Sequence, residues 1–184
     1  MAGGDWTTSE VAYLLANAGR KPMRDICKHL RKSADSVRYM ASRLRAEGTD
    51  ISLRCYVPRV EICPACGCRR GTLGKTGICE VCERREQLAT IHGRIAELMP
   101  LLPADEIDKY GETEAETTSR IDPKPKPPAL PPGASYYRRA KAEEAHDMAV
   151  EAWAISNIKR EIKAAQKRKE RIEKKVNSLG RSPE

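Results

Sequence analysis

The chain has 184 residues, a formal net charge of +8, charged side chains at 33% of its positions and no Phe. The content of large apolar residues is too low for one large core, so we expect small units that are stabilised by a metal ion and by helix–helix contacts. No apolar run is long enough to span a bilayer, and none resembles the core of a signal peptide, so we expect a cytoplasmic protein.

The cysteine content and the distribution of charge indicate the cellular compartment and the kind of partner. Seven cysteines, an odd number, favour a reducing compartment over a disulfide framework. Residues 1–56 and 136–184 are basic, whereas residues 99–135 are acidic. This asymmetry indicates a polyanionic partner, most often nucleic acid.

Residues 5–47 predict three short helices, whose starts are marked by capping residues. Thr7 and Glu10 form a capping box, Pro22 suits the first position of a second helix, and Ser33 caps a third helix that runs to about Glu47. Gly19 and Gly48 end the first and third helices. The expected inward-facing side chains are Val11, Leu14, Leu15, Met23, Ile26, Leu30, Val37, Met40, Ala41 and Leu44.

A short turn between the second and third helices is typical of a helix-turn-helix domain, which we place at residues 1–50. Its most informative residues are Asp5-Trp6-Thr7, Glu10, Ile26, Leu30, Lys32-Ser33, Val37 and Leu44. This set resembles the Myb/SANT-like helix-turn-helix domains that are frequent in phage and mobile-element proteins. The resemblance implies that the leading Trp packs into the trihelical core and that the third helix enters the major groove of DNA.

On that fold, the outward face of the third helix is the candidate surface for double-stranded DNA. Arg38 and Arg43 can each donate two hydrogen bonds to guanine, and other polar side chains can reach bases or phosphates. The alternative is an ordinary solvated helix face. The candidate contacts are Arg31, Lys32, Ser36, Arg38, Tyr39, Ser42, Arg43 and Arg45.

Residues 51–62 predict an extended connector, and residues 63–99 predict a zinc ribbon followed by a short helix. Two C-x-x-C pairs, Cys63 with Cys66 and Cys79 with Cys82, have the spacing of a tetrahedral Cys₄ site for Zn²⁺. Because four thiolates close the coordination shell, we expect a structural ion. We treat Cys68 as a non-ligand, although its spacing leaves a role as a ligand open. The span between the pairs adds the candidate phosphate contacts Arg69, Arg70 and Lys75.

The sequence lacks the residues that several classes of enzyme require. Zinc deaminases need an H-x-E motif, and none of His29, His92 and His146 is followed two residues later by Glu. The glycines at positions 71 and 74 are too close together for a Walker loop. A nuclease would need carboxylates around an open metal ion. We therefore assign no catalytic role.

The remainder predicts a linker and a long helix. Residues 100–134 are acidic and then Pro-rich, which indicates a disordered segment followed by a semi-rigid spacer. Residues 135–180 predict one long basic helix. Its apolar positions follow a coiled-coil register, broken by Glu151 and Lys169. They are Met148, Ile155, Ile158, Ile162, Ala165, Ile172, Val176 and Leu179.

Two arrangements of the long helix remain open. Residues 148–179 can pair with a second copy, or they can fold back on residues 84–98, whose apolar seam has the same period. The expected fold class is mainly α, with a trihelical helix-turn-helix, a small Cys₄ zinc ribbon and a long C-terminal coiled-coil helix.

These features together predict a DNA-binding transcriptional regulator of phage or mobile-element type, nucleoid-associated or in the host cytoplasm. The alternative is an adaptor that binds a host complex such as RNA polymerase or a defence system, because zinc ribbons and coiled coils serve that role equally well. A nuclease is a remote third reading. Salt-dependent binding of duplex DNA separates the first two.

Overall fold

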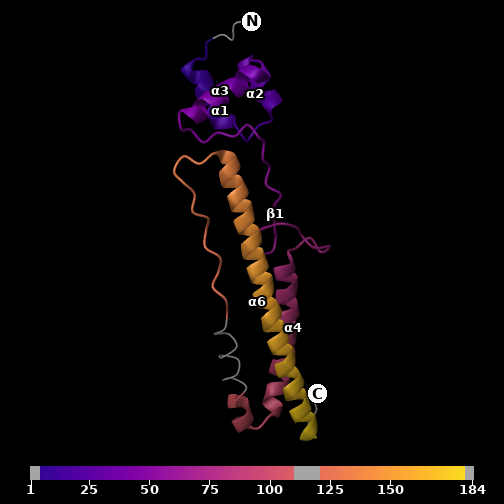
Figure 1. The fold of residues 1–184 in the computed structure, drawn as a ribbon. Coiled ribbons are helices and arrows are strands. Elements are labelled where there is room, and N and C mark those ends of the chain that lie inside the picture. The colour runs from indigo at the N-terminus through magenta and orange to yellow at the C-terminus, as the bar shows by residue number, and fades with distance from the viewer. Residues whose placement is uncertain (1–4, 110–120, 181–184) are drawn as a thin grey trace. The chain divides into compact units, whose positions relative to one another are not determined.

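In the computed structural model, the described residues are 5–109 and 121–180. The chain forms two compact units, each assembled from two separate segments. The trihelical unit comprises Met1–Arg59 and Lys126–His146, and the cysteine unit comprises Val60–Pro125 and Asp147–Glu184. Helices predominate and the one sheet among the described residues has two short strands, which confirms the mainly α fold class (Figure 1).

Three helices form the trihelical unit where their capping residues predicted them. Helix α1 spans Thr8–Asn17, α2 spans Met23–Leu30 and α3 spans Ala34–Ala46. Thr7 and Glu10 make the reciprocal hydrogen bonds of a capping box, and the Ser33 hydroxyl accepts the backbone N–H of Ser36 at 3.2 Å. The starts of α1 and α3 are therefore fixed by local side-chain chemistry. Pro22 is the N-cap of α2, one residue before the predicted position, and makes no side-chain capping bond.

The core of the trihelical unit is small and comes from all three helices. Trp6 packs against it from the N-terminal side, and the Nε1 of Trp6 donates to the Ser36 hydroxyl at 3.2 Å. Leu15, which the sequence placed inward, is 43% exposed, because it lies about 100° around α1 from the fully buried Leu14. The buried residues are Leu14, Ala18, Ile26, Leu30, Val37, Met40, Ala41, Leu44 and Ile51.

The first turns of the long helix α6, which spans Tyr136–Ser178, belong to this unit and not to a separate C-terminal domain. Gly19 has φ of +80°, and a Cβ there would lie 3.3 Å from the backbone N of Tyr137. Glycine thus permits both the turn after α1 and the close approach of α6. The Tyr56 hydroxyl donates to Glu144, which fastens the connector to α6 within the same unit.

The cysteine unit begins with strands β1, Glu61–Ile62, and β2, Arg69–Arg70, which pair antiparallel. Helix α4 spans Glu80–Leu98 and therefore starts before Cys82, whereas the sequence placed its start after that residue. A short 3₁₀ helix, η1, covers Met99–Leu101. The strands flank the first C-x-x-C pair, so Cys63 and Cys66 lie in the loop of a short hairpin.

Helix α6 returns alongside α4 within the cysteine unit, so the fold-back arrangement is the one observed (Figure 1). The helices run parallel, because Lys159 pairs with Glu80 near the start of α4 and Glu173 lies near Arg94, fourteen residues further along both helices. The predicted seam residues Met148 and Leu179 are 54% and 40% exposed and lie outside the contact. The buried seam consists of Ile91, Ile95, Leu98, Leu102, Ile158, Ile162, Ala165, Ile172 and Val176.

The segment expected to be a linker is ordered at its start. Residues 104–109 are helical, Leu102 is 5% exposed within the α4–α6 core, and Glu106 lies 3.3 Å from Lys175. Residues 121–130 have no regular secondary structure, in keeping with their prolines. The remaining acidic part of the expected disordered segment, residues 110–120, lies outside the described residues. Because α4 and α6 run parallel, the chain must return from the end of α4 to the start of α6, and the segment between them makes that connection.

Candidate metal centre

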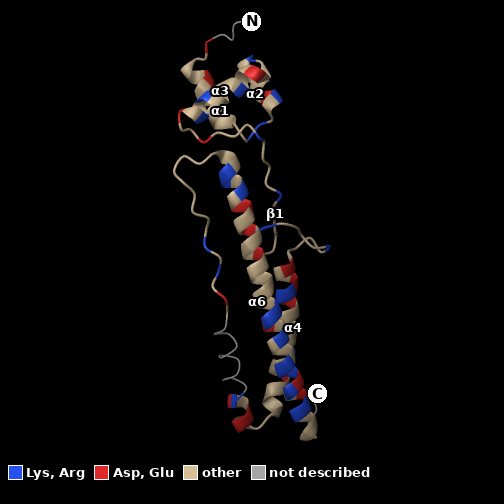
Figure 2. Ribbon diagram, in the orientation of Figure 1, with Lys and Arg blue, Asp and Glu red and all other residues tan. Residues whose placement is uncertain are grey.

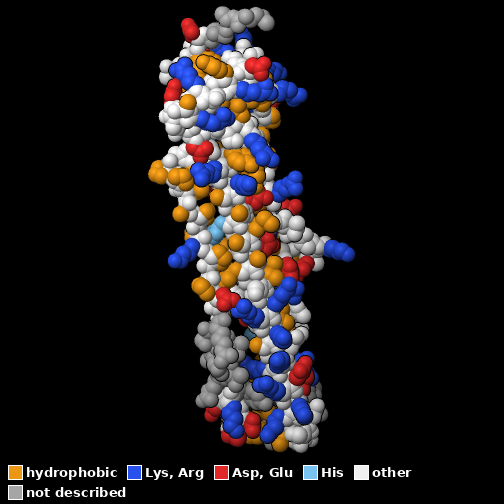
Figure 3. Space-filling model, in the orientation of Figure 1, with side chains coloured by type: hydrophobic (Ala, Val, Ile, Leu, Met, Phe, Trp, Pro, Cys, Tyr) orange, Lys and Arg blue, Asp and Glu red, His pale blue; other side chains and the backbone are white. Residues whose placement is uncertain are grey.

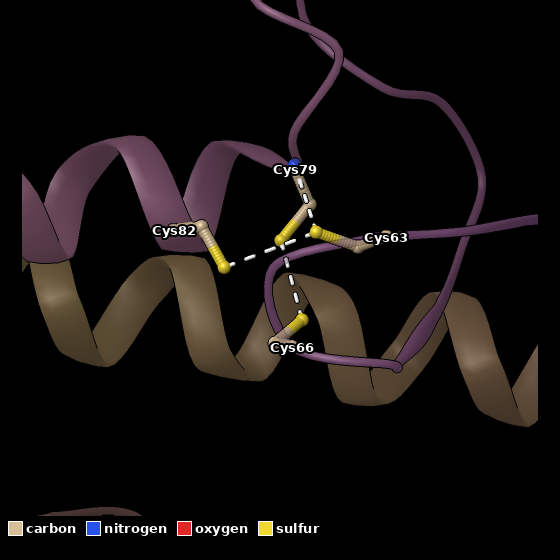
Figure 4. Close-up of side chains that lie close together, drawn as sticks. All are labelled: Cys63, Cys66, Cys79 and Cys82. Atoms are coloured by element: carbon tan, nitrogen blue, oxygen red, sulfur yellow. Dashed lines mark hydrogen bonds between the residues drawn. The ribbon is translucent and has the colours of Figure 1, made fainter.

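Four cysteine side chains converge in the cysteine unit, and they are the four that the sequence predicted as ligands (Figure 4). The Sγ atoms of Cys63, Cys66, Cys79 and Cys82 all lie within 4.8 Å of one another. Cys63 and Cys82 are 3.9 Å apart, and Cys66 and Cys79 are 3.8 Å apart. A regular tetrahedron with Zn–S bonds of about 2.3 Å has S–S edges of about 3.8 Å. The group can therefore hold a tetrahedral metal ion.

The first pair is shaped by a tight backbone turn. Gly67 has φ of +67°, and its N–H donates to the Cys63 carbonyl at 2.8 Å. The Cys63 N–H donates in turn to the Cys68 carbonyl at 3.0 Å. These bonds fold the chain back on itself so that Cys63 and Cys66 point the same way.

The second pair is the start of helix α4. Cys79 is the N-cap and Cys82 lies in the first turn. The positive end of the helix dipole favours negative charge at this position, which lowers the cost of deprotonating cysteines there. One C-x-x-C pair is thus a loop turn and the other a helix N-terminus.

The thiols differ in acidity because their surroundings differ. Burial alone would raise the pKa of Cys63, but the backbone N–H groups of Cys79, Cys66 and Ala65 stabilise its thiolate and hold the pKa at about 6. Burial is also the first cause at Cys82, where it raises the pKa above the ordinary value, with the neighbouring cysteines adding to the effect. Four clustered thiols cannot all ionise without a compensating cation, and a divalent metal ion supplies one.

Arg70 lies beside this cluster and is only 5% exposed. Burial would lower the pKa of Arg70, but hydrogen bonding to Cys79 and the negative charge of nearby cysteines raise it. A buried guanidinium beside thiolates partly neutralises them. The sequence suggested Arg70 as a phosphate contact, whereas the structure places it against the sulfur cluster. No pattern of residue spacing in the sequence predicted that Arg70 would lie beside the cysteines.

Cys68 stands apart from the four clustered thiols. It is exposed, and its Sγ donates to the Cys66 carbonyl at 3.7 Å. The structure thus resolves the choice that spacing alone left open, in favour of Cys66.

Helix α6 supports the metal centre from one side within the cysteine unit. The Gly71 N–H donates to the Glu151 carboxylate at 2.8 Å, and Arg69 lies 3.1 Å from Asp147. Ala154 and Ile155 pack against the buried cysteines. Glu151, which interrupts the coiled-coil register, therefore fastens the hairpin to α6. Arg69, another candidate phosphate contact, is held by Asp147.

The exposed face of α3 carries the central part of the candidate DNA surface. Arg38, Tyr39, Ser42 and Arg43 are all exposed, with Tyr39 at 72%. Arg38 forms an ion pair with Asp35 at 2.7 Å, and Arg43 pairs with Glu47 at 3.0 Å. The two arginines therefore carry their own counter-ions in the free protein.

Other candidate contacts are committed to the fold of the trihelical unit. The Lys32 side chain is 15% exposed, lies 3.5 Å from Glu10 and stacks on the Trp6 ring. Ser36 accepts the Trp6 indole N–H, and Arg45 donates to the Ile51 carbonyl at 3.0 Å. These contacts within the trihelical unit account for the presence of Lys32 and Ser36 as well as a contact with DNA would.

The last two candidates, Arg31 and Lys75, are exposed in separate units. Arg31 ends α2 in the left-handed conformation, with φ of 52°. Lys75 lies in the segment between the cysteine pairs.

Within residues 5–109 and 121–180, the four cysteines are the one group of metal-ligating side chains that lie together, and no helix has the length and apolarity of a membrane span. Comparison of the chain with family models, curated proteins and solved structures finds no match.

Proposed function

We propose that the protein binds double-stranded DNA through helix α3 of the trihelical unit and that its cysteine unit is built around a structural Zn²⁺ ion. The observation that carries the DNA proposal is the exposed row of Arg38, Tyr39, Ser42 and Arg43 on a helix whose opposite side is fully buried. A helix presented in this way fits the major groove, where arginines can read guanine.

Zinc is the metal that best suits the donor set. Four thiolates at tetrahedral spacing, with no carboxylate or imidazole among them, match the structural sites of Zn²⁺. A shell closed by four sulfurs leaves no position for water or substrate. The ion would hold the hairpin and the start of α4 together, and its role would be folding.

The N-terminal part of α3 is fixed by the indole of Trp6. The Trp6–Ser36 hydrogen bond and the Ser33 cap position the first turn of α3 in the trihelical unit. Side chains on a rigid helix are oriented before binding, which reduces the entropy lost when they contact DNA. The family resemblance of the sequence points to the same helix.

The DNA proposal is tested by selection of bound duplexes from a random pool, followed by titration of the selected duplex. Arg43→Ala should weaken binding to it by about 1–3 kcal/mol, since one base contact is removed. The matched control is Arg24→Ala, which removes an exposed arginine from α2. Equal affinities for wild type and Arg43→Ala, with an unaltered melting temperature, would contradict the role of α3.

A protein-binding role is the second candidate, and the ion pairs on α3 favour it. Asp35 and Glu47 already neutralise Arg38 and Arg43, and the Tyr39 ring between them is 72% exposed. Tyrosine is enriched at protein interfaces. An adaptor would show little binding to random duplex at about 50 mM salt, where a protein with several phosphate contacts binds strongly.

A further inference from the structure

The second half of α6 carries basic side chains in a single row. The row consists of Arg160, Lys163, Lys167, Arg171 and Lys174, and each of these residues is exposed. Steps of three and four residues keep them on one face, within an arc of about 80°, because an α-helix turns by about 100° per residue. We call this set the basic stripe. It lies opposite the apolar seam, which is buried against α4.

The stripe is long and unusually free of negative charge. From Arg160 to Lys174 it extends about 21 Å along the helix, at about 1.5 Å per residue. The acidic residues of this part of α6, Glu161, Glu170 and Glu173, lie beside or opposite the stripe. Figure 2 shows Lys and Arg predominating along this part of α6, and Figure 3 shows their side chains on the surface in view.

The residues of the basic stripe also differ from the neighbouring lysines of α6 in their ion pairs with carboxylates. Lys159, Lys169 and Lys175 each lie within ion-pair distance of a carboxylate, that of Glu80, Glu173 or Glu106. Within the stripe, Arg160 pairs with Asp122 at 2.6 Å. The other four, Lys163, Lys167, Arg171 and Lys174, have no ion pair with any carboxylate in the described parts of the chain. Structural pairing therefore explains the flanking lysines and Arg160, whereas the other four members of the stripe have no carboxylate partner among the described residues.

We propose that the basic stripe of α6 binds the sugar–phosphate backbone of duplex nucleic acid, without reading its sequence. Duplex DNA carries about one phosphate per 1.7 Å of its axis when both strands are counted, so a rod of about 21 Å spans a length of duplex with roughly a dozen phosphates. Four unpaired cations along one line can each meet a phosphate and release a counter-ion. The stripe gives general affinity, which is a different contribution from the base contacts of α3.

The chemistry of the stripe favours nucleic acid over a protein or a membrane. The positions that continue it at either end are Ser156 and Ser178, so no apolar or aromatic side chain stands in the row. Protein interfaces are centred on buried aromatic or apolar anchors, and amphipathic membrane helices insert an apolar face. Here the apolar face is already buried against α4. A surface of serine hydroxyls, guanidinium groups and ammonium groups matches a backbone of phosphates.

The inference depends on the proposed DNA-binding function only for the identity of the polyanion, and the two are tested separately. In the stripe variant, Lys163, Lys167, Arg171 and Lys174 are all changed to Gln, which keeps helix propensity while removing four charges. The control variant changes Lys28, Arg85, Lys124 and Lys141 to Gln, none of which is a candidate DNA contact. These are exposed basic residues scattered over the chain, so the change in net charge is the same.

Affinity for a random-sequence 30-base-pair duplex is measured from about 50 to 200 mM salt for the full-length proteins. Neutralising four phosphate contacts should make the slope of log K against log[salt] shallower by about 3.6, while the control variant keeps a slope close to that of wild type. Zinc content and helical circular dichroism report whether the stripe variant is folded. A folded stripe variant with the wild-type slope would overturn the proposal.

Two further measurements, on Arg43→Ala and on lipid vesicles, distinguish the possible outcomes. Arg43→Ala should leave random-duplex affinity nearly unchanged and lower the preference for a selected duplex. If the stripe variant loses affinity and Arg43→Ala loses no preference, the stripe proposal stands and the role of α3 fails. If wild type binds no duplex, both fail. Loss of binding to phosphatidylserine vesicles in the stripe variant, with unchanged duplex binding, would assign the stripe to membranes and overturn the proposal.

Discussion

The Lys159 ammonium lies 3.3 Å from the Glu80 carboxylate, which joins the middle of α6 to the residue immediately after Cys79 of the cysteine cluster. The Arg84 guanidinium shares the same carboxylate at 2.7 Å. Hydrogen bonding to Arg84, followed by the smaller effects of Lys159, holds the pKa of Glu80 below its ordinary value. The metal centre and the parallel helix pair are therefore contiguous within the cysteine unit, and their stabilities should be coupled.

Removal of one metal ligand should unfold more than the hairpin. Cys79→Ser deletes a buried thiol at the first residue before α4, so we expect loss of bound zinc and cooperative loss of helical signal from the α4–α6 pair. Circular dichroism and metal analysis measure both effects. Cys68→Ser is the matched control, because Cys68 is exposed and outside the cluster. Full zinc occupancy in Cys79→Ser would contradict the assignment of the site.

The side chain of Asn157 is an unusual feature of α6. It is 7% exposed, and neither its Nδ2 nor its Oδ1 has a hydrogen-bond partner in the part of the chain that the structure describes. Unpaired buried amide atoms cost about 1–3 kcal/mol. We expect Asn157→Leu to stabilise the protein by about 1 kcal/mol in denaturant unfolding. Asn177→Leu, on an exposed position of the same helix, should change stability little. Destabilisation by Asn157→Leu would show that the amide is bonded in solution.

Acid should weaken the trihelical unit through Glu10. The backbone N–H of Thr7, and then the charge of Lys32, lower the pKa of Glu10 below its ordinary value of 4.5. Because the folded pKa is the lower one, this stabilisation is complete above the unfolded pKa and disappears as the pH falls through the folded pKa. Melting temperatures between about pH 6 and pH 3 should fall less steeply in Glu10→Gln than in wild type.

Glu143→Gln is the control for that acid dependence, because Glu143 is exposed in the same unit. It should reproduce the wild-type decrease. If Glu10→Gln followed the same curve as wild type, the capping box would not be the source of the acid sensitivity.

The backbone at Arg31 offers a stabilising substitution. Arg31 has φ of 52°, a left-handed conformation that costs a non-glycine residue about 1 kcal/mol. Arg31→Gly should therefore raise the unfolding free energy by about 0.5–1 kcal/mol. Lys28→Gly, inside α2, should lower it by a similar amount, since glycine disfavours a helix interior. Thermal unfolding distinguishes the opposite signs, and destabilisation by Arg31→Gly would contradict the helix-end geometry.

The sequence by itself determined the features that depend on near neighbours in the chain. Thr7 and Ser33 predicted the starts of two helices, because capping is decided within one helical turn. Pro22 predicted the start of the third to within one residue, because its ring fixes the local backbone. The C-x-x-C spacing predicted which four thiols converge, since a knuckle needs only a few residues. An apolar period of three and four residues likewise predicted a long helix with one buried face.

Tertiary structure decided which surfaces those elements bury and which charges remain free. Arg70 and Lys163 are both basic, yet one lies buried against the cysteines and the other is exposed on α6. Glu151 broke the predicted register and proved to be the acceptor for Gly71, eighty residues earlier in the chain. Such contacts depend on the packing of segments that are distant in sequence, and local patterns of charge or hydrophobicity carry no information about their partners.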